Sequence, residues 1–126
     1  MESPRQPNPV LIFEGIQAYQ RSAALKAAIE LEIFTAIAAG NRTADAIAKT
    51  ASASTRGIRI LCDYLVIQNF LSKNGGQYSL TPESAIFLDK KSPAYFGAAI
   101  GFLLDPRLLA AYLNLTEIIR TGKTLT

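Results

Sequence analysis

The stretch that decides the fold runs from Ser54 to Leu80 and reads STRGIRILCDYLVIQNFLSKNGGQYSL. Its first half has apolar residues at i, i+3, i+4, i+7 and i+8, which is the spacing of one buried helix face: Ile58, Leu61, Cys62, Leu65 and Val66. Ser54 or Thr55 is suited to cap the start of this helix, and Asn69 is a tolerable left-handed residue at its end. The pattern predicts a helix that packs firmly against its neighbours.

The second half of the stretch predicts a β-hairpin. Asn74-Gly75 is a typical two-residue hairpin turn, because both positions accept positive φ. We therefore expect a wing from Leu71 to Leu80, in which Leu71, Tyr78 and Leu80 close a core. A helix followed directly by such a wing is typical of a winged helix, a shape that serves DNA binding in some proteins and subunit assembly in others.

Upstream of this stretch the sequence predicts three helices. Asn8-Pro9 pairs a capping side chain with a proline at the first helical position, and helical spacing continues through Ile29. A short second helix carries Phe34 and Ile37 and stops at Gly40-Asn41. Thr43 caps the third helix, TADAIAKTA, where Asp45 in the first turn suits the helix dipole.

Downstream we expect helices over 82–88, 93–104 and 106–120, each opened by a proline after a Thr, Ser or Asp. The second of these is apolar nearly all round, AYFGAAIGFLL, so it should be buried on every side. The sequence favours burial by a second subunit over burial within the chain, with small residues allowing close helix approach. The predicted dimer-interface residues are Tyr95, Phe96, Gly97, Ile100, Gly101, Phe102 and Leu104.

The composition fits a single domain with a partner. At 126 residues the chain can form one core, but it is 49% hydrophobic and only 18% charged, with a mean hydropathy of +0.18. That is more apolar surface than one small core covers, so some should face another molecule. Charges interrupt every long apolar run, so we expect no membrane span.

Several classes of chemistry are not expected. The sequence has no histidine, which removes the commonest general base and metal ligand, and the lone Cys62 sits in a helix-patterned run where core packing is its expected role. The net charge of +3 is scattered, so nucleic-acid binding has weak electrostatic support. Residues 1–8 lack the apolar segment of a secretory signal and are expected to be a disordered lead-in, which favours a cytoplasmic location.

The order of these motifs resembles a known family. ALKAAIELEIFTAI, TADAIAKTA, STRGIRILCDYLVIQNFL, GGQYSLTPES, SPAYF and LTEIIRTGKT follow one another from about Phe13 to Thr126. They resemble the N-terminal dimerisation domain of S-adenosylmethionine-dependent O-methyltransferases of the plant caffeate and hydroxyneurosporene type. The resemblance implies a mainly α fold, in which a winged-helix-like domain with one small β-hairpin and extra helices forms an intertwined homodimer.

The resemblance places catalysis outside this chain. In that family the cofactor and the catalytic histidine belong to a separate Rossmann-like domain, and a glycine-rich turn after a strand is missing from these 126 residues. We therefore expect no catalytic residue, no cofactor-binding residue and no metal ligand here, with S-adenosylmethionine and a hydroxylated, aromatic acceptor implied for the parent enzyme. The expected domain covers 9–120, and 121–126, including the superficially phosphate-loop-like RTGKT, begins a linker to the catalytic domain.

Two details of the resemblance concern particular residues. Three turns at which the family usually has glycine carry Glu32, Ser52 and Asn69 instead, so the break after the first helix could have a different shape. By position, the resemblance also implies that the first helix lines part of the partner's substrate pocket. The candidates are Phe13, Ile16, Tyr19 and Gln20, although the simpler interpretation places Ile16 and Tyr19 in the dimer core.

Two other functions remain open from the residues alone. A free-standing dimeric winged-helix transcriptional regulator would read DNA with Arg56 and Arg59 and touch a phosphate with Lys73, but Asp63 lies along the same helix. A lipid or small-ligand pocket would use the aromatic residues Tyr95, Phe96 and Phe102.

Overall fold

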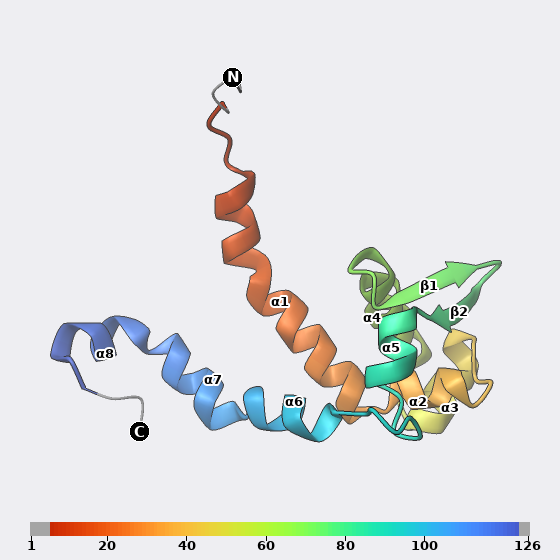
Figure 1. The fold of residues 1–126 in the computed structure, drawn as a ribbon. Helices are drawn as coiled ribbons and strands as arrows, with labels where there is room; N and C mark the ends of the chain where they lie inside the picture. Colours follow the sequence, from red (N-terminus) through yellow and green to blue (C-terminus); the bar gives the residue numbers. More distant parts are fainter. Residues whose placement is uncertain (1–5, 124–126) are drawn as a thin grey trace.

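The computed structural model describes residues 6–123, and in this range the chain is mainly helical with one small hairpin, as predicted. Figure 1 shows a core from which α1 and the last three helices project in two different directions. The predicted lead-in over 1–8 and linker over 121–126 lie partly outside the described residues. The elements are α1 (Val10–Glu30), α2 (Ile33–Ala38), α3 (Ala44–Ala51), α4 (Thr55–Ile67), β1 (Leu71–Asn74), β2 (Gln77–Leu80), α5 (Pro82–Phe87), α6 (Gly97–Leu103), α7 (Pro106–Leu113) and α8 (Leu115–Thr121).

The hydrophobic core lies where α2, α3, α4, α5 and the hairpin meet the C-terminal end of α1. All of its buried apolar residues fall between Ala28 and Leu88. The stripe predicted on α4 is confirmed, because Ile58, Cys62 and Leu65 are buried and Leu61 and Val66 pack against them. Cys62 is fully buried, as predicted for a small hydrophobe.

Most of the predicted helix caps are present, but Thr81 makes no side-chain capping hydrogen bond at the start of α5, and Ser92 does not cap a helix. The Asn8 side chain accepts a hydrogen bond from the Val10 N–H at 2.7 Å, Thr43 accepts from Ala46 at 3.2 Å, and Ser54 accepts from Gly57 at 3.1 Å. Each bond satisfies a backbone donor that has no partner within its helix. Because these bonds are local, the starts of α1, α3 and α4 could be predicted from the sequence.

The wing has the predicted extent, but its turn is one residue later than predicted. Leu71 pairs with Leu80 and Asn74 with Gln77, so the two central turn residues are Gly75 and Gly76, not Asn74-Gly75. Both glycines have positive φ, 58° and 78°. Glycine takes this conformation without steric cost, so two consecutive glycines outcompete an Asn-Gly pair for the turn.

The three turns that carry a residue other than glycine are all left-handed. Glu32, Ser52 and Asn69 have φ of 56°, 53° and 68°. The break between α1 and α2 therefore keeps a left-handed shape despite the glutamate. The Glu32 carboxylate forms an ion pair with Lys90, whose backbone N–H donates to Thr35 Oγ1 at 3.0 Å.

Two predicted helices differ from the structure. The helix expected from Pro93 begins only at Gly97, because the Tyr95 and Phe96 N–H groups bond back to Ser92 and Phe87 at 3.1 Å and hold this segment against α5. The single helix expected over 106–120 is divided at Asn114, which has φ −98° and ψ 22°, into α7 and α8. Asparagine is a weak helix former, so the break falls on it.

Membrane-spanning potential is limited to one bent segment. Within the described residues, no single helix has the length and hydropathy needed to cross a bilayer. The pair formed by Gly97–Leu113 and Leu115–Thr121, bent by 61°, meets the criterion by length and composition only.

Candidate assembly surface

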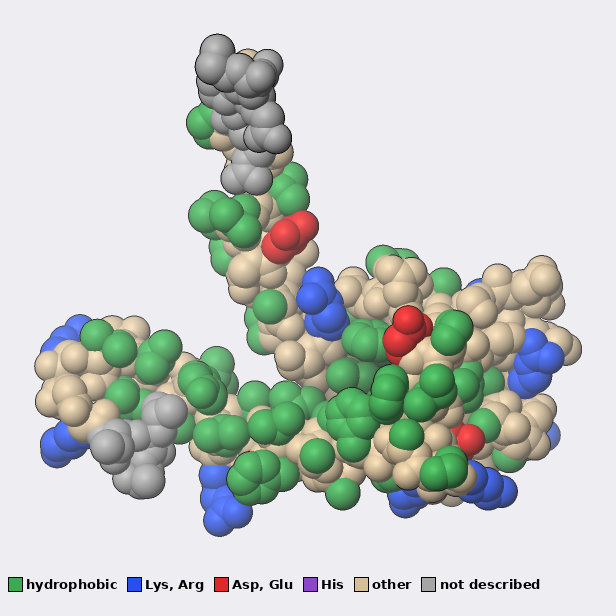
Figure 2. Space-filling view, viewed as in Figure 1, with side chains coloured by type: hydrophobic (Ala, Val, Ile, Leu, Met, Phe, Trp, Pro, Cys, Tyr) green, Lys and Arg blue, Asp and Glu red, His purple; other side chains and the backbone are tan. Residues whose placement is uncertain are grey.

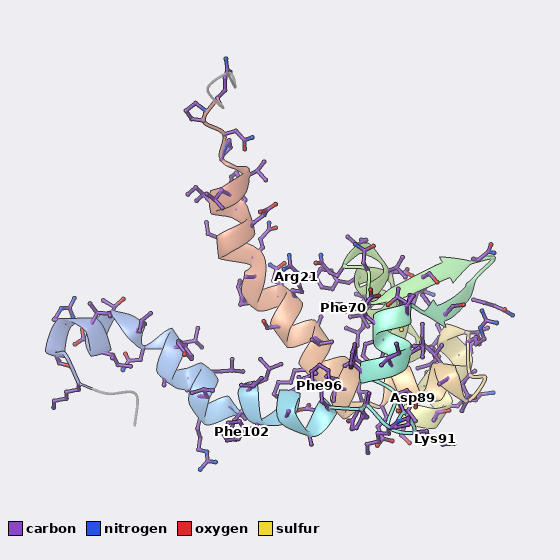
Figure 3. The ribbon with its side chains drawn as sticks, in the orientation of Figure 1. Arg21, Phe70, Asp89, Lys91, Phe96 and Phe102 are labelled. Atoms are coloured by element: carbon purple, nitrogen blue, oxygen red, sulfur yellow. The ribbon has the colours of Figure 1, made fainter. Side chains whose placement is uncertain are left out.

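The N-terminal half of α1, Val10–Tyr19, projects from the core and carries exposed apolar side chains. We call this segment the α1 tip. Arg21 marks the point where α1 leaves the core, because its Nε donates to Gln68 Oε1 beyond the end of α4 at 2.7 Å (Figure 3). The four predicted pocket-wall residues lie at or next to the tip, all of them exposed: Phe13, Ile16, Tyr19 and Gln20.

Helices α6, α7 and α8 form a second projection, which we call the arm. Figure 2 shows hydrophobic side chains along the arm and around its junction with the core. No residue of α7 or α8 is buried. The largest exposed side chains of the arm are Phe102, Leu103, Tyr112, Leu113, Leu115 and Ile119. A solvent-exposed surface of this kind marks a contact with another molecule.

The predicted interface residues on α6 divide into two groups. Gly97 is buried beneath the Tyr95 ring of the same chain, Ile100 packs against the core, and Leu104 is partly buried. Phe96 is half exposed and meets Phe87 edge-on at 5.3 Å. Gly101 and Phe102 face outward, and Phe102 lies farther along the arm than Phe96 (Figure 3). Part of this apolar stretch is therefore covered by its own chain.

Two apolar hollows flank α1. One is a cleft of about 460 Å³ between α1 and α7, lined by Tyr19, Ser22, Ala23, Lys26, Ala27, Glu30, Leu109 and Leu113. The other is a groove of about 390 Å³ between α1 and α4, lined by Gln20, Ala24, Gly57, Ile60, Leu61 and Tyr64. Of the predicted pocket-wall residues, Tyr19 faces the first hollow and Gln20 the second.

Contacts between α4 and the wing oppose the DNA-binding alternative. Asp63 Oδ1 accepts hydrogen bonds from Tyr78 Oη at 2.6 Å and Lys73 Nζ at 2.8 Å, and the ammonium also lies 5.0 Å from the Tyr78 ring centroid. The lysine expected to touch a phosphate is thus paired within the chain. Beside Arg56 and Arg59, α4 exposes Ile60 and Ile67, which suit an apolar contact. No observation supports the regulator hypothesis.

The same contacts shift several pKa values. Hydrogen bonds from Lys73 and Tyr78 lower the pKa of Asp63, and the carboxylate in turn raises the pKa of Lys73. Burial, followed by the hydrogen bond to Asp63, raises the pKa of Tyr78 to about 12. Burial also raises the pKa of Cys62 to about 12, which makes this thiol a poor nucleophile near neutral pH. Within residues 6–123 no three His, Cys, Asp or Glu side chains gather in a metal-binding group.

Sequence reasoning missed the contribution of α4 and α7 to this surface. Ile60 and Ile67 are exposed on the side of α4 opposite the predicted core stripe, so the stripe gave no indication of them. Leu109 and Leu113 are spaced four residues apart on α7, a helical signal that is visible in the sequence. Their position opposite α1 depends on long-range packing, so no local pattern could have placed them there.

Comparisons with known proteins agree with this architecture. A family model described as the O-methyltransferase dimerisation domain matches residues 13–90. The chain is 32% identical over 113 residues to the tetracenomycin polyketide synthesis 8-O-methyl transferase TcmO of Streptomyces glaucescens, covering 89% of this chain and 33% of that protein.

Solved structures show the same fold. A protein from Nostoc punctiforme described as an O-methyltransferase superposes with a TM-score of 0.86 at 47% identity, over 94% of this chain and 36% of that one. Human N-acetylserotonin methyltransferase, solved in complex with SAM, superposes with a TM-score of 0.82 at 25% identity, over 97% and 37%. The chain thus spans about a third of the length of the proteins that it resembles.

Proposed function

Because this chain belongs to the O-methyltransferase dimerisation domain family, we propose that it forms the homodimer interface of an S-adenosylmethionine-dependent O-methyltransferase. The observation that carries the proposal is the exposed apolar surface shared by the α1 tip and the arm. Neither segment has enough contacts in its own chain to cover these side chains, and a second copy would cover both at once.

The parent activity that we propose is methyl transfer from S-adenosylmethionine to a hydroxyl group of an aromatic acceptor. The names of the related proteins support O-methyl transfer, and human N-acetylserotonin methyltransferase was solved with SAM. In such a reaction the acceptor oxygen attacks the methyl group in line, and positioning in a closed pocket supplies much of the rate. The proposal includes a cytoplasmic location, because S-adenosylmethionine is an intracellular cofactor.

Within that enzyme, this chain would contribute assembly and a part of the pocket wall. We assign residues 9–120 to the dimerisation domain and 121–126 to the start of a linker to the catalytic domain. Of the four predicted pocket-wall residues, Phe13 and Gln20 are proposed to line the acceptor pocket of the partner subunit, whereas Ile16 and Tyr19 are proposed to lie in the dimer core. The exposure of all four on a projecting helix supports these roles. The exposed part of the predicted α6 set, Phe96, Gly101 and Phe102, is proposed to contact the partner.

Sedimentation equilibrium over a wide concentration range tests the assembly. We expect a mass of twice 13.6 kDa that falls on dilution, accompanied by loss of helical circular dichroism as the tip and arm lose their cover. A monomer of 13.6 kDa with full helicity at every concentration would refute the proposed function.

A further inference from the structure

We propose that α1 pairs with α1 of a second copy in an antiparallel arrangement, in which the two-fold axis passes between Ile16 and Tyr19. In this arrangement Ile12 of each copy enters the α1–α7 cleft of the other. The inference rests on the proposed function, since it requires that two copies associate. It adds three details to that function: the helix that lies at the two-fold axis, the antiparallel orientation of its two copies, and the residue that fills the cleft.

The first support is a stripe along α1. Ile12, Ile16, Tyr19 and Ala23 are spaced by four, three and four residues, the spacing at which one helix packs along another. At about 100° per residue these four positions stay on one side of the helix. All four are exposed in the single chain. The three large residues of the stripe lie at the α1 tip, and the small residue, Ala23, lines the cleft.

The second support is the shape of the cleft. Its floor consists of the small residues Ser22, Ala23 and Ala27, while Leu109 and Leu113 on α7 form the opposite wall. Lys26 and Glu30, its charged lining residues, form an ion pair with each other, so neither needs a partner from outside. The cleft of about 460 Å³ is therefore suited to receive apolar side chains from a helix.

The third support is the register that links these two features. Ile12 and Ala23 lie equally far from the midpoint between Ile16 and Tyr19. When two copies of α1 run antiparallel about that midpoint, Ile12 of each faces the partner's Ala23, and a protruding side chain meets a small one twice. A parallel pair would instead place Ile12 against the partner's Ile12 and leave both clefts unfilled. The self-complementary register identifies the occupant as a second copy.

Disulfide cross-linking of the full chain tests the register. Ile16→Cys should give a covalent dimer under mild oxidation, because the two copies of residue 16 would lie only about three residues apart along the helices. Ile12→Cys should not, because its two copies would be about 16 Å apart along the axis, beyond the roughly 7 Å limit between Cα atoms. Ile12 and Ile16 are 62% and 60% exposed, so accessibility is matched. The native Cys62 is fully buried and should stay reduced.

A pair of variants tests the contact itself. Ile12→Cys and Ala23→Cys should each remain uncoupled alone, but should cross-link to each other when the two chains are co-expressed. Ala23→Trp should weaken dimerisation at least tenfold by filling the cleft, and adding Ile12→Ala should restore part of the loss. The control is Ala18→Trp, an exposed alanine about 130° around the same helix, which should leave dimerisation unchanged.

The outcomes separate the inference from the proposed function. Cross-linking of both Ile12→Cys and Ile16→Cys, each to its own copy, would show a parallel pair and overturn the inference. Cross-linking of Ile12→Cys alone would show an antiparallel pair in another register and overturn it too. A dimer by sedimentation in which none of these cysteines cross-links would overturn the inference and leave the proposed function intact. A monomer by sedimentation would overturn both.

Discussion

Glu32 offers a direct measure of how much backbone strain this fold tolerates. It occupies the left-handed corner between α1 and α2 with φ of 56°, a conformation that costs a residue with a Cβ atom about 1 kcal/mol more than glycine. Its carboxylate recovers part of that cost through the ion pair with Lys90. Both side chains are about half exposed, so the recovered part is small.

Comparing two variants separates the strain from the ion pair. Glu32→Ala loses the ion pair and keeps the strain, so it should be slightly less stable than the natural chain. Glu32→Gly loses the same ion pair but also the strain. The free energy of unfolding of Glu32→Gly should therefore exceed that of Glu32→Ala by about 1 kcal/mol, which corresponds to roughly 4 °C in Tm for a chain of this size.

The assay is urea and thermal unfolding at one fixed protein concentration, because the stability of a dimer depends on concentration. Asn69→Gly serves as the control, since asparagine tolerates the left-handed conformation and should gain only a few tenths of a kcal/mol. Equal stability of Glu32→Gly and Glu32→Ala would refute the reasoning, because it would mean that the corner carries no conformational strain.

Three further predictions concern the wing, α6 and the α1 tip. Hydrogen bonds from Lys73 and Tyr78 lower the pKa of Asp63, so its contribution to stability is present above about pH 4 and is lost as the pH falls through its folded-state pKa. Asp63→Asn should flatten this acid-side loss in pH-dependent unfolding, and an unchanged profile would contradict a stabilising role for these two bonds. Gly97→Ala should cost about 1 kcal/mol in thermal unfolding, because its Cβ would overlap the outer end of the Tyr95 ring and force this partly exposed side chain to move. Truncating Tyr95 to alanine should make the double variant less costly than the sum of the two. Phe13→Ala in the intact enzyme should raise the KM for the acceptor and leave the affinity for S-adenosylmethionine unchanged; an unaffected KM would remove Phe13 from the pocket wall.

Features set by neighbouring residues could be predicted from the sequence. The caps at Asn8, Thr43 and Ser54 each act within three residues, and the buried stripe of α4 follows from helical spacing alone. The left-handed turn at Glu32 was harder to predict, because the local preference of glutamate opposes it. There the packing of α1 against α2 outweighs a local cost of about 1 kcal/mol.

Features set by distant contacts could not be predicted. The segment before Gly97 stays non-helical because it is bonded to α5, and Pro93 therefore does not open a helix there. The α1–α7 cleft depends on the direction in which the arm leaves the core. The spacing of apolar residues along the sequence does not predict that direction. Of the candidate site, the sequence resemblance pointed to residues at the α1 tip, such as Phe13 and Ile16, but not to the hollow beside α1.

The shape of a winged helix does not determine its use; the outward face of α4 and the state of the wing do. A DNA-reading helix needs polar side chains that reach bases and a wing with free cations. Here α4 presents Ile60 and Ile67, and Asp63 on the same helix holds the wing lysine, Lys73, against Tyr78. The carboxylate that would repel a phosphate instead anchors the hairpin to the core. The contacts of Asp63 that hold the wing against α4 thus also occupy the lysine that a DNA-binding wing would need. The exposed apolar side chains of α4, the α1 tip and the arm instead suit contact with another protein.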